Sequence, residues 1–161
     1  MKTESEVLNE MARYCSQSER CLHDVHNKIK AADLPADAVK RITDSLLKDK
    51  FIDEKRFSRS FVNDKFKFNQ WGRIKICYEL KQRNIPPDIY GEAVENIDED
   101  EYLSALADLL NRKKRAVKGA SPQDVFQKLY RFAASRGFES QLIVKTLKSI
   151  LKNIEYEQYP E

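Results

Sequence analysis

The chain repeats its apolar pattern three times, and this repeat limits the possible folds more than any other feature. When the breaks at Leu34, Ile85 and Phe138 are aligned, apolar residues fall into register across 51 and then 53 residues. The register consists of Val25, Ile76 and Leu129; Ile29, Leu80 and Ala133; Ala38, Ile89 and Leu142; Val39, Tyr90 and Ile143; and Leu46, Ile97 and Ile150. Tandem units of about fifty residues bury their apolar faces against their neighbours. The pattern therefore predicts an all-α protein of three tandem three-helix repeats in an elongated, curved array, with a compact nine-helix globule as the alternative.

Helical periodicity between capping and breaking residues places the individual helices. We expect helices over 3–15, 19–31, a third from Pro35 to Leu47, then 54–68, 71–83, one starting at 85–88, 101–116, 123–136 and 140–153. These helices group into repeats over 1–50, 51–98 and 99–153, followed by a disordered tail over 154–161.

Several helix ends carry local signals. Ser16 and Glu19 have the spacing of a capping box, and Asp53 can cap the helix that follows it. Ser121 with Pro122 is a typical helix start. Leu46 and Leu47 are both assigned to the buried face of the third helix.

The composition excludes several classes of protein. A third of the 161 residues are charged and only four are glycine, which favours helices. The sequence has no long apolar run and no secretory leader, so we expect a cytoplasmic protein without membrane contact. Cys15, Cys21 and Cys77 form no CxxC motif and are expected to be reduced, mostly buried thiols.

Charge is distributed unevenly along the chain, although the net charge is only +3. Residues 48–83 carry eleven Lys and Arg against five Asp and Glu, and residues 109–136 carry eight against one. Between them, residues 88–108 carry eight acidic residues and no basic one. This alternation predicts separate charged surfaces.

No pattern of residues predicts an active site or a cofactor. Cys15, Cys21, His23 and His26 could in principle supply zinc ligands, but Cys21 belongs to an apolar stripe and the histidines are expected to be exposed. The acids from Asp98 to Glu101 are expected to form a solvated turn that opens a helix. We therefore expect a protein that is not an enzyme and that needs neither cofactor nor metal.

Basic residues interleaved with aromatic residues are the strongest candidates for a binding site. Cations beside Phe66, Phe68 and Trp71 are typical of single-stranded nucleic acid binding, although these aromatic residues could instead close the core between two repeats. A second cluster from Arg112 to Arg115 ends a helix, where it also complements the helix dipole. The predicted DNA- or partner-binding residues are Lys65, Lys67, Trp71, Arg73, Lys75, Lys81, Arg83, Arg112, Lys113, Lys114, Arg115, Lys128 and Arg131.

Three segments in order resemble the RecX family of bacterial regulators. They are FIDEKRFSRSFV at 51–62, GRIKICYELKQRNI at 72–85 and KLYRFAASRGF at 128–138. The resemblance implies three three-helix repeats and a small cytoplasmic protein that binds the RecA nucleoprotein filament and suppresses its ATP hydrolysis and strand exchange, within DNA repair, recombination and the SOS response. It implies no catalytic residue. The chain departs from the family pattern at Cys21, at Asn69-Gln70-Trp71 and at Ala133.

Two functional hypotheses follow. In the first, a monomer binds along the RecA filament. Its basic faces meet DNA phosphates or acidic protein, and its acidic 88–108 segment faces basic protein. Its contact with single- or double-stranded DNA is weak and non-specific. In the second, the chain is a stand-alone DNA-binding helical protein whose repeats resemble helix-turn-helix units.

Overall fold

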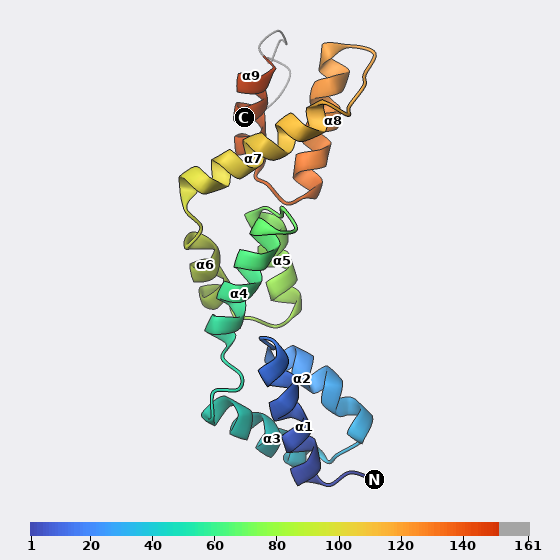
Figure 1. Ribbon diagram of the computed structural model, residues 1–161, viewed down its shortest axis with the longest axis vertical. Helices are drawn as coiled ribbons and strands as arrows, with labels where there is room; N and C mark the ends of the chain where they lie inside the picture. Colours follow the sequence, from blue (N-terminus) through green and yellow to red (C-terminus); the bar gives the residue numbers. More distant parts are fainter. Residues whose placement is uncertain (152–161) are drawn as a thin grey trace. The chain divides into compact units, whose positions relative to one another are not determined.

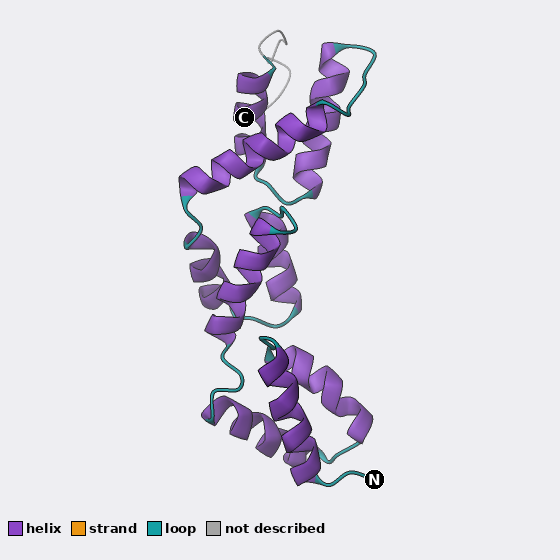
Figure 2. Cartoon of the chain, in the orientation of Figure 1, coloured by secondary structure: helices purple, strands orange, loops and turns teal. Residues whose placement is uncertain are grey.

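The computed structural model describes residues 1–151, and these residues form helices and connecting turns without a β-strand (Figures 1 and 2). The predicted all-α class is confirmed. The helices are α1 (Glu4–Gln17), α2 (Leu22–Ile29), the 3₁₀ helix η1 (Lys30–Ala32), α3 (Ala36–Lys48), α4 (Glu54–Lys67), α5 (Arg73–Gln82), α6 (Pro87–Glu95), α7 (Glu99–Lys114), α8 (Pro122–Ser135) and α9 (Ser140–Ile150). The predicted tail over 154–161 lies outside the described residues.

The chain divides into two compact units. The first consists of residues 1–61 and 79–93, and the second consists of residues 62–78 and the chain from 94 onward. Helices α4, α5 and α6 contribute residues to both units. The repeat boundaries near residues 50 and 98 stay a prediction.

The core of the first unit is built by α1, α2 and α3, which pack against one another (Figure 1). Its buried residues recur at three- and four-residue steps along each helix, as an apolar stripe on a helix requires. They are Val7, Met11, Cys15, Val25, Ile29, Ile42, Leu46 and Ile52.

Two sequence-based predictions in this unit are wrong. The helix α1 continues to Gln17 and α2 starts at Leu22, so Ser16 and Glu19 form no capping box. Asp24 instead accepts a hydrogen bond from the Cys21 N–H at 3.2 Å, while Glu19 pairs with the Arg56 Nε at 2.6 Å. Leu47 is 40 % exposed, because only Leu46 faces the core.

The core of the second unit lies between α7, α8 and α9 (Figure 1). Its largest fully buried side chains are Tyr102, Leu106, Leu110, Phe126, Leu129, Ile143 and Leu147. The helix starts read from the sequence are confirmed here, since the Ser121 hydroxyl accepts from the Asp124 N–H at 3.1 Å. The Asp98 carboxylate likewise caps α7 by accepting from the Glu101 N–H at 3.0 Å.

Two of the five aligned positions of the repeat register are buried in all three repeats. Val25, Ile76 and Leu129, which align across the three repeats, are all fully buried. Ile29, Leu80 and Ala133, one helical turn later, are buried as well. The internal repeat in the sequence therefore corresponds to equivalent core positions on α2, α5 and α8.

The N-terminus of α5 is capped by residues far away in the sequence. The first N–H groups of a helix have no partner within it. Here the Gly72 and Ile74 N–H groups donate to the carbonyls of Arg136 and Gly137, at 2.7 and 3.0 Å. The Arg73 N–H donates to the Tyr102 hydroxyl at 2.9 Å. This contact holds the segment before α5 against the end of α8.

Candidate functional site

Arg73, one of the predicted binding residues, is held within the second unit by a network of contacts. Its guanidinium donates to Glu139 at 2.8 Å, pairs with Glu99 and lies 3.7 Å from the centroid of the Tyr102 ring. The Tyr102 hydroxyl donates to Glu139 as well. Only 21 % of the Arg73 side chain is exposed. Its charge is therefore balanced by two carboxylates, and Arg73 serves the packing of α5 against α7 and α9.

Burial separates the three aromatic residues that precede α5. Phe66 is 8 % exposed and stacks on Tyr102 with ring centroids 5.7 Å apart, so it closes the core. Phe68 is 79 % exposed. Trp71 is half-buried. Of the two alternatives left open by the sequence, closure of the core is confirmed for Phe66, whereas a binding role for Phe68 and Trp71 stays a prediction.

Trp71 organises two of the predicted lysines. The Nζ atoms of Lys65 and Lys75 lie 5.0 and 4.7 Å from the centroid of the indole ring. Ammonium groups at this distance from an indole are held by cation–π attraction. The ring thereby brings two cations together from α4 and α5.

Phe132 on α8 likewise lies beside two cations, one at the end of α7 and one at the end of α8. Lys113 Nζ lies 4.8 Å, and the Arg136 guanidinium 5.1 Å, from the centroid of the Phe132 ring. Arg112, Lys113 and Lys114 occupy the last turn of α7, as the sequence indicated. Cations in this turn are also stabilised by the carbonyl end of the helix dipole.

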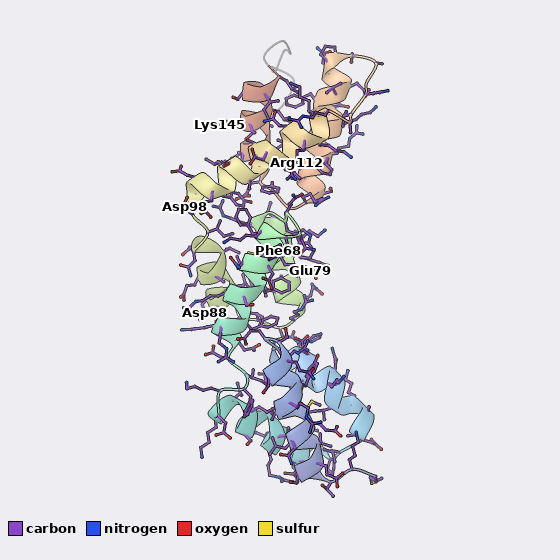
Figure 3. The ribbon with its side chains drawn as sticks, viewed as in Figure 1. Phe68, Glu79, Asp88, Asp98, Arg112 and Lys145 are labelled. Carbon is purple, nitrogen blue, oxygen red and sulfur yellow. The ribbon has the colours of Figure 1, made fainter. Side chains whose placement is uncertain are left out.

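The turn between α4 and α5 brings these two basic groups together. The Asn69 carbonyl accepts a hydrogen bond from Arg136 at 2.9 Å. The Gln70 side-chain oxygen, with its amide oriented toward the guanidinium, accepts from Arg112 at 2.6 Å. Arg112 lies on α7 and Phe68 at this turn (Figure 3). We call the resulting set the basic turn surface; it consists of Lys65, Lys67, Phe68, Trp71, Lys75, Arg112, Lys113 and Arg136.

Arg136 was missed by the sequence reasoning. The sequence carried a signal for it, because Arg136 lies in the basic 109–136 segment, two residues before the break at Phe138. What the sequence could not supply was its contact with a carbonyl 67 residues away.

The remaining predicted residues lie elsewhere or make local contacts. Lys81 and Arg83 belong to the first unit, where Arg83 pairs with Glu79 at 3.3 Å. Lys128 donates to the Lys118 carbonyl at 2.7 Å, and Arg131 donates to the Gln127 side chain at 3.2 Å. Lys114 and Arg115 are exposed at the end of α7.

An open groove runs between α7 and the end of α4. One side carries the carboxylates of Asp98, Glu101 and Asp108, and the other carries Lys67. Arg112 also lines the groove, next to Gln70. The acids predicted to open a helix therefore do so, and they line a surface beside the cations.

Residues 1–151 contain no group of three or more His, Cys, Asp or Glu side chains placed to hold a metal ion. Over the same residues, no helix is long and apolar enough to cross a membrane.

Family models match two consecutive parts of the chain. The model for the second three-helix domain of RecX matches residues 53–94, and the model for the third matches residues 99–147. The chain belongs to the RecX family. The match to the second domain covers α4, α5 and α6 except Glu95. The match to the third domain covers α7, α8 and α9 except its last three residues.

Full-length relatives agree with this assignment. The chain is 29% identical over 149 residues to the regulatory protein RecX of Prosthecochloris aestuarii, covering 91% of this chain and 95% of that protein. It is 32% identical over 131 residues to the regulatory protein RecX of Clostridium botulinum, covering 79% of this chain but 60% of the longer clostridial protein. We therefore describe the chain as a regulatory protein of the RecX family and not as an enzyme.

Solved structures share the fold. A crystal structure of a regulatory protein RecX has a TM-score of 0.81 at 20% identity, covering 94% of this chain and 73% of that one. RecX from Lactobacillus salivarius has a TM-score of 0.79 at 18% identity, covering 94% and 97%. Together with the family models for three-helix domains, these matches confirm the predicted fold.

Proposed function

We propose that this RecX-family protein binds the RecA nucleoprotein filament in the cytoplasm and inhibits its ATP hydrolysis and strand exchange. The observation that carries the proposal is the basic turn surface, where cations from two segments of the chain meet beside an exposed aromatic ring. A nucleoprotein filament is a polyanion that such a surface attracts.

The arrangement of charges favours a partner that presents both phosphates and basic protein side chains over DNA alone. Lys65, Lys67 and Lys75 lie near the turn, while Asp98, Glu101 and Asp108 line the groove along α7. Adjacent carboxylates repel phosphates, which weakens binding to naked DNA, but they pair with basic side chains of a protein. A nucleoprotein filament offers both phosphates and basic protein side chains.

The experiment is a titration of the chain into a single-stranded-DNA-dependent ATPase assay of the RecA protein from the same source. Inhibition at or below equimolar protein is the expected result. The charge-reversal variant Lys67→Glu with Lys113→Glu should raise the half-inhibitory concentration about tenfold in ~0.1 M salt, because two of the six cations of the surface are reversed. Arg73 is left intact, since its ion pairs support the fold.

The matched control is Lys145→Glu, an exposed lysine on α9 outside the basic turn surface (Figure 3). It changes the net charge in the same direction and should leave inhibition unaltered. Circular dichroism confirms that each variant keeps its helical content. Inhibition that is equally strong in the charge-reversal variant removes this surface from the proposal.

The second candidate is stand-alone DNA binding, which the cations of the same surface favour. It predicts tight binding to duplex DNA without RecA and a steep loss of affinity with salt. Absence of ATPase inhibition by the folded chain, together with such binding, would replace the first proposal with the second.

A further inference from the structure

Helix α5 carries apolar side chains on two opposite faces. Ile76 and Leu80 are fully buried, whereas Ile74 is 57 % and Tyr78 59 % exposed. Residues two apart in an α-helix point about 200° from each other, since each residue turns the helix by roughly 100°. One apolar face of α5 is therefore packed and the opposite one is open to solvent.

Apolar side chains on the exposed face are unusual for a helix with one face in solvent. A helix that is apolar all round is normally buried all round, and solvent-facing positions are normally polar. Ile74 and Tyr78 are four residues apart, so their side chains are neighbours and form one continuous patch. A single exposed apolar residue needs no explanation, but two adjacent ones more than half exposed do.

The chain on the N-terminal side of this patch is basic, and Glu79, which follows Tyr78, pairs with Arg83 at 3.3 Å. Residues 65–78 contain no Asp or Glu, and they include Lys65, Lys67, Arg73 and Lys75. Arg73 is neutralised by Glu99 and Glu139, whereas Lys75 lies on α5 between Ile74 and Tyr78. Lys75 lies one helical turn before Tyr78. A partner of opposite charge therefore has carboxylates beside its apolar side chains.

The chemistry of the patch favours protein over nucleic acid. Bases stack on flat π-systems, and sequence-tolerant nucleic acid binding relies on a row of aromatic rings. Ile74 is branched and aliphatic, and it occupies the position where a second ring would be needed beside Tyr78. Aliphatic and aromatic anchors one turn apart are what an amphipathic segment of a protein packs against.

We propose that the α5 strip, consisting of Ile74, Lys75 and Tyr78, docks a protein segment that combines apolar residues with Asp or Glu. The inference does not depend on the proposed function, because its test contains no RecA and its supporting result is peptide binding.

The test selects short random peptides displayed on phage against the immobilised full chain. Before this selection, peptides that bind the double variant Ile74→Ser with Tyr78→Ser are removed from the library. Synthetic versions of the recovered peptides are then measured by fluorescence anisotropy. We expect recovered sequences rich in apolar and acidic residues, with affinity lowered about tenfold or more in the double variant, as for anchor residues of an interface.

Two further variants define the specificity. Lys75→Glu should weaken the acidic peptides severalfold, and Leu47→Ser, which removes an exposed apolar residue of the first unit, should leave them unchanged. Circular dichroism checks that all variants are folded. The proposal is overturned if no peptide distinguishes the double variant from the parent chain, or if the recovered peptides are basic. It is also overturned if the double variant loses affinity for oligothymidylate instead.

Discussion

Gly72 and Gly137 lie against each other with no room for a side chain between them. A Cβ atom on Gly72 would be 2.6 Å from the Phe138 nitrogen and closer still to the Gly137 carbonyl. A Cβ atom on Gly137, whose φ is +92°, would be 2.5 Å from the Lys75 nitrogen. Both contacts are with backbone atoms, which cannot move aside as the end of a side chain can. This pair of glycines is the reason that the N–H groups of α5 can reach the end of α8.

We predict that Gly72→Ala lowers the free energy of unfolding by about 1–3 kcal/mol, because the added methyl group overpacks this contact. Urea unfolding followed by circular dichroism measures the effect. Gly91→Ala is the control, since a Cβ atom there meets nothing within 4 Å and the residue lies inside α6. That substitution should raise stability by about 0.5–1 kcal/mol through helix propensity. Equal effects at both glycines would contradict the close contact.

Phe66 and Phe68 should respond very differently to truncation, although they are two residues apart. Phe66→Ala removes a buried ring from its stack on Tyr102 and should cost about 3–5 kcal/mol. Phe68→Ala removes an exposed ring and should change stability by less than about 0.5 kcal/mol. Chemical denaturation of the two variants side by side measures both values. A large loss in Phe68→Ala would show that its ring is packed.

Removal of the Tyr102 hydroxyl should destabilise the second unit. Tyr102→Phe leaves the Arg73 N–H without its acceptor and removes the hydroxyl donor to Glu139, which keeps its bond from the Arg73 guanidinium, at a cost of about 1–3 kcal/mol. Burial, followed by the hydrogen bond to Glu139, raises the pKa of Tyr102, so its phenol should not ionise until the protein unfolds in alkali. Ultraviolet absorbance of the phenolate during a pH titration tests this. The stability control is Tyr78→Phe, where the ring is exposed and little change is expected.

The stability of the protein should fall at alkaline pH partly through Cys21. Burial raises the pKa of the Cys21 thiol from 9.0 to about 12, which favours the neutral form in the folded chain. The unfolded chain therefore loses this proton first as the pH rises. The stabilising contribution is complete below the ordinary thiol pKa and is lost between that value and about 12.

The slope contributed by one such group is at most about 1.4 kcal/mol per pH unit. Urea unfolding of the parent chain and of Cys21→Ala from about pH 8 to about pH 10 compares the two slopes. We expect a lower stability but a flatter pH dependence in the variant. Parallel curves would mean that Cys21 ionises equally easily in the folded and unfolded chain.

Much of the helical framework could be predicted from the sequence, because its signals are local. The starts at Asp98 and Ser121 and the core positions Val25, Ile76 and Leu129 follow from capping residues and from spacing along a single helix. The same kind of local signal was misleading between α1 and α2. Ser16 and Glu19 had the right spacing for a cap, but Glu19 is used by Arg56, which lies on another helix.

The candidate site could be predicted only as a list of cations. Charge and spacing identified Lys65, Lys75 and the cluster at the end of α7, and these residues remain candidates. Neither property distinguishes Arg73, which is held by two carboxylates, from Lys67, which is exposed. That distinction depends on Glu139, 66 residues further along the chain.

By itself the sequence determined the helices, the threefold register and the family, because periodicity, capping and motifs are carried by neighbouring residues. Only the tertiary structure decided which aromatic side chains are buried and which cations meet. The turn at Asn69 and Gln70 joins Arg136 and Arg112 through hydrogen bonds, and the absence of side chains at Gly72 and Gly137 lets the backbones approach. Contacts across such distances in sequence arise from packing, which no local pattern specifies.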